Sequence, residues 1–299
     1  MERCVLRLLA RFLTLAALGA CTTPSAPTWP IPEGASTQVV NGSPLTYRSR
    51  GFGPIVVFVP GVLTDYRVWE STLAGWEANY RVITVSPRHF FPERWDGRGT
   101  DFTFRQHAKD LDAFLETLPG PIYLVGWSFG GRVAFDAARA RPDLVRKLVL
   151  VEAPLDALVT TPDAGQASVR QRRAEATAKF FNAGDIDGGL AYAIDDINGP
   201  GAWAATPQSF RPMLRDNAWT VAGIREEPER VTCADFASLK VPVLLVRGEL
   251  TTPYFKRIVE EQGSCLPQAK TATIPKAGHA SPLLNPPAFK EAVTSFLQP

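Results

Sequence analysis

The feature that most constrains this chain is a glycine-rich turn between two regular elements. Ile122–Val125 is an apolar run typical of a buried parallel strand, and an amphipathic helix begins at Phe129. Between them stands the pentapeptide Gly-Trp-Ser-Phe-Gly (residues 126–130), with a further glycine at Gly131. Glycines suit so sharp a turn, because a Cβ atom there would collide with the strand or the helix. The segment therefore predicts a nucleophile elbow that presents the Ser128 hydroxyl.

The turn also predicts what else a reaction at Ser128 requires. The Phe129 N–H lies at the start of a helix, where it can donate to a developing oxyanion. A serine hydroxyl is a weak nucleophile near neutral pH, so it needs a neighbouring base and a third group that holds this base in the right tautomer. Histidine suits the base, because its pKa lies near the working pH.

Three segments in order resemble the α/β-hydrolase superfamily: V-V-F-V-P-G-V at Val56–Val62, the elbow, and A-G-H at Ala277–His279. The resemblance covers roughly residues 37 to 299. It implies an α/β fold with a mostly parallel central sheet, helices on both faces, and a helical cap inserted before the penultimate strand. It also implies that the second oxyanion N–H belongs to Val62. Many relatives have His where this chain has Pro60, a departure that leaves the backbone donor intact.

The base is assigned among three histidines. His279 follows the last predicted strand, where the family's histidine stands, so we expect it to be the base. His89 precedes the elbow, which is the wrong place for the superfamily's order of serine, acid and histidine. His107 lies beside the apolar face of a predicted helix and suits a structural role.

The acid is less clearly marked. Relatives usually carry Asp three residues past the glycine of the penultimate strand, and here that position is Thr251. Two carboxylates are alternatives, because Glu152 ends the preceding predicted strand and Glu249 directly follows Gly248. We favour Glu152 and keep Glu249 open, with Asp156 a distant third.

The rest of the chain alternates strands and helices around this site. Asn41-Gly42 predicts the turn of a hairpin between Thr37–Val40 and Leu45–Ser49, and Thr103 with Gln106 predicts a capping box. Further strands are predicted at Val82–Val85, Lys147–Val151, Val241–Val246 and Ala272–Ile274, and helices at Val68–Ala78, Pro253–Gln262 and the C-terminus.

The alternation stops in residues 155–230, which we interpret as the cap. Helices are predicted there at Val169–Asn182, Leu190–Ile197 and Phe210–Ile224. Its aromatic residues suit either the core of the cap or the roof of an apolar pocket; they are Phe180, Phe181, Tyr192, Trp203, Phe210 and Trp219. The core is then formed by residues 37–154 and 231–299.

The N-terminus has the pattern of an export signal. Arginines surround a short apolar run that ends in Leu-Gly-Ala-Cys at residues 18–21. We expect a signal peptide over residues 1–20, a lipid on Cys21 and a tether rich in Pro, Ser and Thr over residues 21–36, with secretion without a lipid as the alternative. The protein would then be a periplasmic or cell-envelope lipoprotein.

Export leaves two cysteines, Cys233 and Cys265, in an oxidising compartment. Each lies shortly before a predicted strand, and sequential βα units usually lie side by side, so we predict a disulfide between them. The bridge would contribute roughly 3 kcal/mol by loop entropy.

Composition excludes several classes of function. A net charge of +2 with no basic stripe gives no sign of a nucleic-acid partner, and neither a metal nor a cofactor is expected. The main hypothesis is a serine hydrolase that acts on a small or medium carboxylic ester, a thioester or a lactone. The alternatives are a C–C bond hydrolase or cofactor-free peroxidase on the same fold, and a catalytically silent binding protein. The oligomeric state stays open.

Overall fold

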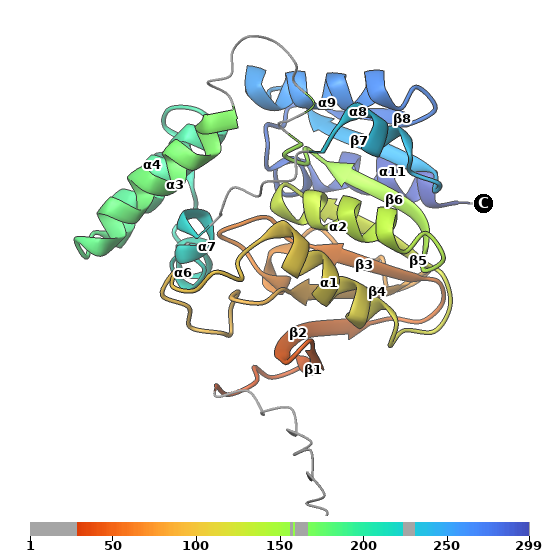
Figure 1. Ribbon diagram of the computed structural model, residues 1–299, viewed down its shortest axis with the longest axis horizontal. Helices are drawn as coiled ribbons and strands as arrows, with labels where there is room; N and C mark the ends of the chain where they lie inside the picture. The colour runs from red at the N-terminus through yellow and green to blue at the C-terminus, as the bar shows by residue number, and fades with distance from the viewer. Residues whose placement is uncertain (1–28, 156–157, 159–166, 224–230, 299) are drawn as a thin grey trace, which may run out of the picture.

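The computed structural model describes residues 29–155, 158, 167–223 and 231–298 (Figure 1). The predicted signal peptide, Cys21 and Asp156 lie outside these residues. At the centre is an eight-stranded sheet in the order β1-β2-β4-β3-β5-β6-β7-β8. Strand β2 is antiparallel to both of its neighbours, and all other pairs are parallel. The predicted α/β-hydrolase sheet is therefore present.

The strand bounds follow the predictions to within a few residues. Strand β7 differs most, because it begins and ends two residues later than predicted. The strands are β1 (Ser36–Val40), β2 (Ser43–Arg50), β3 (Ile55–Val59), β4 (Arg81–Ser86), β5 (Ile122–Trp127), β6 (Val145–Val151), β7 (Val243–Gly248) and β8 (Lys270–Ile274).

Helices flank the sheet, and α3 to α8 come between β6 and β7 in the chain. They are the 3₁₀ helix η1 (Tyr66–Trp69), α1 (Phe104–Leu115), α2 (Phe129–Ala140), α3 (Ala167–Asn182), α4 (Ile186–Asn198), α5 (Ala202–Ala205), α6 (Arg211–Asp216), α7 (Trp219–Ala222), α8 (Cys233–Ala237), α9 (Pro253–Cys265), α10 (Ser281–Leu284) and α11 (Pro286–Leu297). Among the residues described here, no helix has the length and apolar character needed to cross a membrane.

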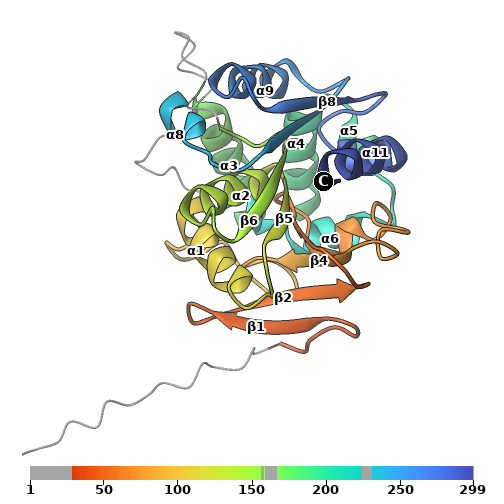
Figure 2. The same cartoon turned by 90° about the vertical axis from the view of Figure 1, so that its right-hand side faces the viewer.

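Two apolar layers sandwich the sheet, because alternate side chains of each central strand point to opposite faces. In β3, Val57 packs toward α1, α2, α8 and α9, whereas Phe58 packs toward η1 and α11. Figure 2 shows α1 and α2 on one side of the strands and α11 on the other. This double burial explains why the central strands read as unbroken apolar runs.

The predicted hairpin is confirmed. Strands β1 and β2 pair antiparallel with Val40 opposite Ser43. The two residues between them, Asn41 and Gly42, have φ angles of 46° and 77°. Asn and Gly tolerate this left-handed conformation best, which is why the pair marked the turn.

The helix predicted at Val68–Ala78 is wrong. The chain forms η1 and then a series of turns, in which the Trp76 N–H donates to the Leu73 carbonyl. Gly75 adopts a φ of 74° in the middle of the segment, and a left-handed residue interrupts a helix.

Two other predictions need correction. The single helix expected at Phe210–Ile224 is divided into α6 and α7 at Asn217, whose side chain donates to Asp65. Ile224 lies outside the described residues. The capping box of α1 is only half formed. Thr103 accepts from the Gln106 N–H, but the Gln106 side chain donates to Asp110 instead.

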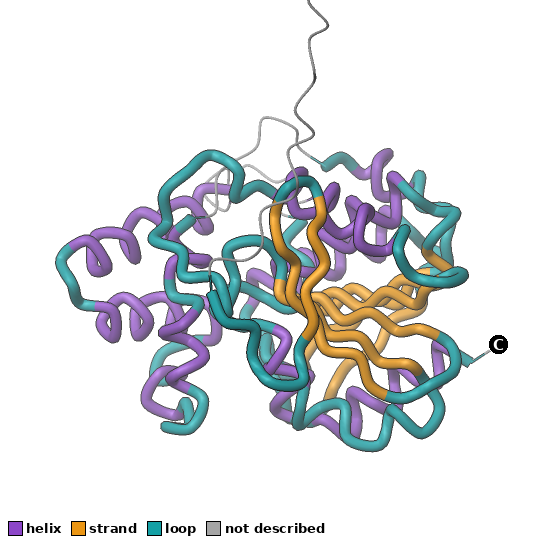
Figure 3. The backbone as a smooth tube through the Cα atoms, turned by 90° about the horizontal axis from the view of Figure 1, so that it is seen from below, coloured by secondary structure: helices purple, strands orange, loops and turns teal. Residues whose placement is uncertain are grey.

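Helices α3 to α7 form the cap, which lies to one side of the sheet (Figure 3). Four of the six predicted cap aromatics form two pairs of contacting rings, and the other two, Trp203 and Phe210, are partly buried against the apolar core of the cap. Phe181 and Trp219 pack together inside the cap with ring centroids 5.1 Å apart. Phe180 and Tyr192 stack on its surface, and their exposed fractions are 37% and 38%.

The disulfide predicted between Cys233 and Cys265 is present, with the two Cα atoms 5.1 Å apart. It joins the start of α8 to the end of α9. The bridge thus closes a loop that contains α8, β7 and α9.

Candidate active site

Ser128 occupies a strained turn between β5 and α2. Its φ and ψ angles are 52° and −121°, a conformation that a residue with a side chain rarely adopts. A Cβ atom on Gly130 would lie 2.4 Å from the Val59 carbonyl oxygen, and one on Gly126 would lie 2.3 Å from the Gly130 carbonyl oxygen. Only glycines allow strand and helix to approach this closely, so the geometry is that of a nucleophile elbow.

The turn after β3 lies against the elbow. A Cβ atom on Gly61 would be 3.3 Å from the Ser128 Cβ atom, so this backbone is next to the serine. The N–H of Leu63 is occupied, because it donates to Thr220 Oγ1 at 2.8 Å. The preceding N–H belongs to Val62. Phe129 begins α2, where the first N–H groups have no partner within the helix.

The structure brings His279 and Glu152 together. His279 Nδ1 is 2.6 Å from Glu152 Oε2, and the two side chains are 4% and 0% exposed. A carboxylate at Nδ1 favours the tautomer with its proton on that nitrogen, which leaves Nε2 able to accept a proton. This is the arrangement that a general base requires.

Two further donors hold the buried carboxylate of Glu152. The Gly248 N–H donates to Oε1, and the Thr251 hydroxyl donates to Oε2, each at 2.8 Å. Thr251 stands where relatives usually carry the acid, and here it is a hydrogen-bond donor to the acid on the neighbouring strand. Glu152 itself has a φ of 46°, a strained conformation of the kind that clusters at functional sites.

The alternative carboxylate, Glu249, makes a different contact. It is exposed, and its Oε2 accepts the Lys276 backbone N–H at 2.8 Å. The structure therefore places Glu152 and not Glu249 at the imidazole.

Two aromatic residues hold the His279 ring and the loop that carries it. The Phe255 ring, from the first turn of α9, stacks on His279 with centroids 3.8 Å apart. The indole N–H of Trp127 donates to the His279 carbonyl oxygen at 3.0 Å. Because Trp127 directly precedes Ser128, this bond holds the histidine loop beside the elbow.

The other two histidines have different surroundings. His89 Nδ1 is 2.7 Å from Glu93 and Nε2 is 3.0 Å from Asp101. Burial acts to lower the pKa of His89, but the hydrogen bonds and charges of the two carboxylates outweigh it, so this pKa is raised. Burial lowers the pKa of His107, whose ring nitrogens face the carbonyl oxygens of Thr103 and Arg88.

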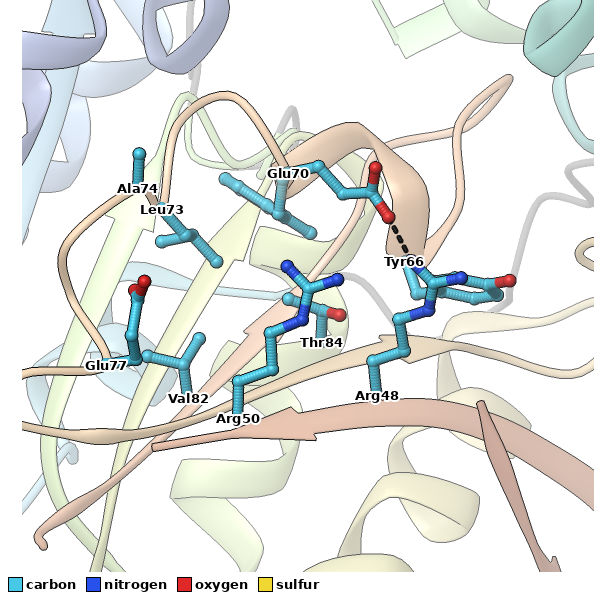
Figure 4. A pocket seen from close by; sticks show the side chains of 10 residues that line it. Arg48, Arg50, Tyr66, Glu70, Leu73, Ala74, Glu77, Val82 and Thr84 are labelled. Carbon is cyan, nitrogen blue, oxygen red and sulfur yellow. Dashed lines mark hydrogen bonds and ion pairs between the residues drawn. The ribbon is translucent and has the colours of Figure 1, made fainter. Parts of the chain in front are cut away.

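Two hollows in the surface of the protein lie away from Ser128, His279 and Glu152. A cavity of about 60 Å³ lies between β2, β4 and the turns after η1, where Arg48 pairs with Glu70 (Figure 4). A cleft of about 440 Å³ is lined mainly by α1 and α2. Neither is lined by Ser128, His279 or Glu152. No group of His, Cys, Asp and Glu in the described part of the chain could hold a metal ion.

Sequence reasoning missed two contacts of the site. Thr251 was read only as a missing acid, although a hydroxyl three residues past Gly248, the last residue of β7, can reach the neighbouring strand. Phe255 gave no signal beyond its place on the apolar face of a helix. Both contacts depend on how the ends of β6, β7 and α9 meet in space.

Comparisons with known proteins agree with this fold. The model of the alpha/beta hydrolase family matches residues 56–292. The chain is 25% identical to the 2-(acetamidomethylene)succinate hydrolase of Mesorhizobium japonicum, over 85% of this chain and 91% of that protein. It is 26% identical to the pimeloyl-[acyl-carrier protein] methyl ester esterase of Vibrio atlanticus, over 85% and 98%. Among solved structures, the bromoperoxidase of Bacillus anthracis superposes with a TM-score of 0.72 at 21% identity, over 88% and 99% of the two chains.

Proposed function

Since this chain belongs to the alpha/beta hydrolase family, we propose that it is a serine hydrolase that cleaves a small or medium carboxylic ester through an acyl-enzyme. The observation that carries the proposal is the buried 2.6 Å contact between His279 and Glu152. His279 lies on a loop whose backbone is bonded to Trp127 of the elbow. A likeness of fold alone would not require a strained serine, an imidazole and a buried carboxylate at one edge of the sheet.

In the proposed mechanism, Ser128 Oγ attacks the ester carbonyl while His279 Nε2 takes its proton. The Glu152 carboxylate keeps the imidazole in the required tautomer and stabilises the imidazolium that forms. The N–H groups of Val62 and Phe129 donate to the oxyanion of the tetrahedral intermediate. His279 then protonates the leaving alcohol, and water releases the acid from Ser128 by the same steps in reverse order.

The choice of ester as substrate rests on the chemistry of the site and on one relative. The protein of Vibrio atlanticus is named a methyl ester esterase, and that of Mesorhizobium japonicum a hydrolase. Thioesters and lactones pass through the same tetrahedral intermediate, so they belong to the same proposal.

We propose further that the protein is exported and carries a lipid on Cys21. The basic and apolar pattern of residues 1–21 supports this, and so does the Cys233–Cys265 disulfide, because such bonds persist in oxidising compartments. Fractionation of cells that express the parent and Cys21→Ser proteins tests it. The parent should sediment with membranes and the variant should not; equal distribution would contradict the lipid anchor.

Labelling with a fluorophosphonate probe, together with turnover of p-nitrophenyl acetate, tests the hydrolase proposal. The parent protein should be labelled and should hydrolyse the ester, whereas Ser128→Ala should do neither while keeping its circular-dichroism spectrum. If the alanine variant hydrolyses the ester at the parent rate, Ser128 is not the nucleophile. If the parent is neither labelled nor active, the protein is a binding protein on this fold.

A further inference from the structure

One hydrogen bond joins the cap to the turn that carries Val62. The Leu63 N–H donates to Thr220 Oγ1 at 2.8 Å, and Thr220 is 1% exposed. The Thr220 hydroxyl donates its own proton to the Asn217 carbonyl oxygen at 2.6 Å. Since that proton is used, the lone pairs of the hydroxyl face Leu63, and the group acts there only as an acceptor.

The turn needs such an anchor because of its backbone conformation. Leu63 has a φ of 66°, and residues with a branched side chain rarely adopt this left-handed conformation. Its side chain is 4% exposed and packs in the apolar core of the cap, beside Leu214, Ala218 and Val221. Both the side chain and the N–H of Leu63 are therefore held from the cap and not from the sheet.

A second set of polar contacts surrounds the first. Asn217 donates to Asp65 Oδ2 at 2.7 Å and accepts the Phe91 N–H at 2.8 Å. Arg67 bridges the two segments, because it bonds to Asp65 and to Asp216 of α6. Asp65 is 0% exposed and Asn217 is 1% exposed, so water cannot replace these contacts easily.

From these contacts we propose that Thr220 is a positioning residue of the oxyanion hole. Two peptide planes meet at Val62. Thr64 Oγ1 donates to the Gly61 carbonyl oxygen at 2.9 Å and holds the first plane, which carries the Val62 N–H, whereas Thr220 holds the second, which carries the Leu63 N–H. Without the second contact the turn loses an anchor next to the Val62 N–H, whose direction relative to Ser128 is then less well fixed. The cap then helps to build the catalytic site in addition to covering it. This inference rests on the proposed function, and its test is designed to separate the two.

Thr220→Val removes the acceptor and keeps the shape of the side chain, so it tests the proposal directly. We expect kcat for p-nitrophenyl acetate to fall roughly 10- to 100-fold, less than the roughly 100- to 1,000-fold loss that follows removal of one oxyanion donor, while KM changes little. The rate of fluorophosphonate labelling should fall by a similar factor. Thr220→Ser keeps the hydroxyl and should restore both rates.

A matched control comes from the same cap. Thr177 of α3 is 0% exposed, and its hydroxyl has no hydrogen-bond partner among the described residues. Thr177→Val makes the same chemical change without touching the turn, so it should leave kcat at the parent value. If circular dichroism shows that Thr220→Val does not fold, Thr220→Ala replaces it in the same comparison.

The outcomes separate the two proposals. Parent-like kcat in Thr220→Val, an equal loss in Thr177→Val, or no recovery in Thr220→Ser would each overturn the role of Thr220. Activity and labelling of the parent that do not depend on Ser128 would overturn the proposed function itself. A loss confined to Thr220→Val, with recovery in Thr220→Ser, supports the inference.

Discussion

The molecule contains two pairs of a histidine and a glutamate with nearly equal geometry. His279 Nδ1 is 2.6 Å from Glu152, and His89 Nδ1 is 2.7 Å from Glu93. The pairs differ at the other ring nitrogen. Nε2 of His89 is bonded to a second carboxylate, Asp101, at 3.0 Å. The first pair stands at the ends of strands beside the elbow, whereas the second belongs to the loop between β4 and α1.

This difference shows that a short contact with a carboxylate does not make a histidine a base. A general base needs one nitrogen held by a partner and the other free to accept a proton. Two carboxylates around His89 favour its protonated form, in which both nitrogens donate and neither accepts. The geometry therefore supports the proposed catalytic role of His279 and Glu152, and it favours a structural role for His89 and Glu93.

The largest expected effect tests this assignment directly. His279→Ala should lower kcat for p-nitrophenyl acetate by about a million-fold, as typically follows loss of a triad base. His89→Gln should keep most of the parent activity, because no step of the proposed mechanism uses its ring. Steady-state kinetics of the two variants, at a pH where both are folded, makes the comparison. A greater loss in His89→Gln would reverse the two roles.

A smaller effect is expected at the carboxylates. Glu152→Gln should lower kcat by about ten-thousand-fold, because the amide cannot stabilise the imidazolium and favours the wrong tautomer. Glu249→Gln is the matched control, since Glu249 is exposed and accepts the Lys276 backbone N–H just after the next strand. The reverse ranking of their kcat values would move the acid to Glu249. Near-full activity in both would show that neither carboxylate orients His279.

Features of the fold and of the candidate site that depend on neighbouring residues were predictable from the sequence. The elbow, the hairpin turn and the buried strands each depend on local rules: glycines where a Cβ atom has no room, and apolar runs where both faces are covered. The disulfide followed from the count of cysteines and the order of the strands. These rules need no knowledge of distant contacts.

Features that depend on distant contacts were not predictable in the same way. The sequence left Glu152 and Glu249 as alternatives, because the choice depends on which strand end faces His279. It did not show that Thr251 donates to the acid of the neighbouring strand. It also predicted one helix where α6 and α7 are separated, because Asn217 bonds to Asp65, 152 positions away. In each case tertiary contacts outweigh local preference.

The two histidine pairs also differ in what stabilises their surroundings. Helix α9 carries Phe255, which stacks on His279, and ends at Cys265, which is bonded to Cys233 of α8. Replacing both cysteines with Ala should lower the free energy of unfolding by about 3 kcal/mol, since the unfolded chain loses a constraint. Urea denaturation measures it. The value of kcat should stay near that of the parent. An unchanged free energy of unfolding would show that the disulfide does not stabilise the fold.

Ionic contacts hold the second pair instead. Glu93, Asp101 and the stacked Trp95 ring surround His89, and Arg88 joins Asp101 to Asp110. His89→Gln removes the cation and leaves these carboxylates short of a partner. We expect a loss of about 1–2 kcal/mol in the free energy of unfolding near pH 6, the smallest effect predicted here.

The pH dependence of that loss distinguishes an ionic contact from simple packing. Because the pKa of His89 is raised in the folded protein, folding favours the protonated ring. Its stabilising contribution is complete below the ordinary pKa of about 6.5 and disappears as pH rises through the folded value. The difference in free energy of unfolding between the parent and His89→Gln should therefore be large at about pH 6 and shrink toward about pH 9. Urea denaturation of both proteins across this range measures it. If the difference in free energy of unfolding stays constant with pH, His89 stabilises the loop by packing alone. The two histidine pairs would then differ in the partners of their ring nitrogens but not in the charge of the ring.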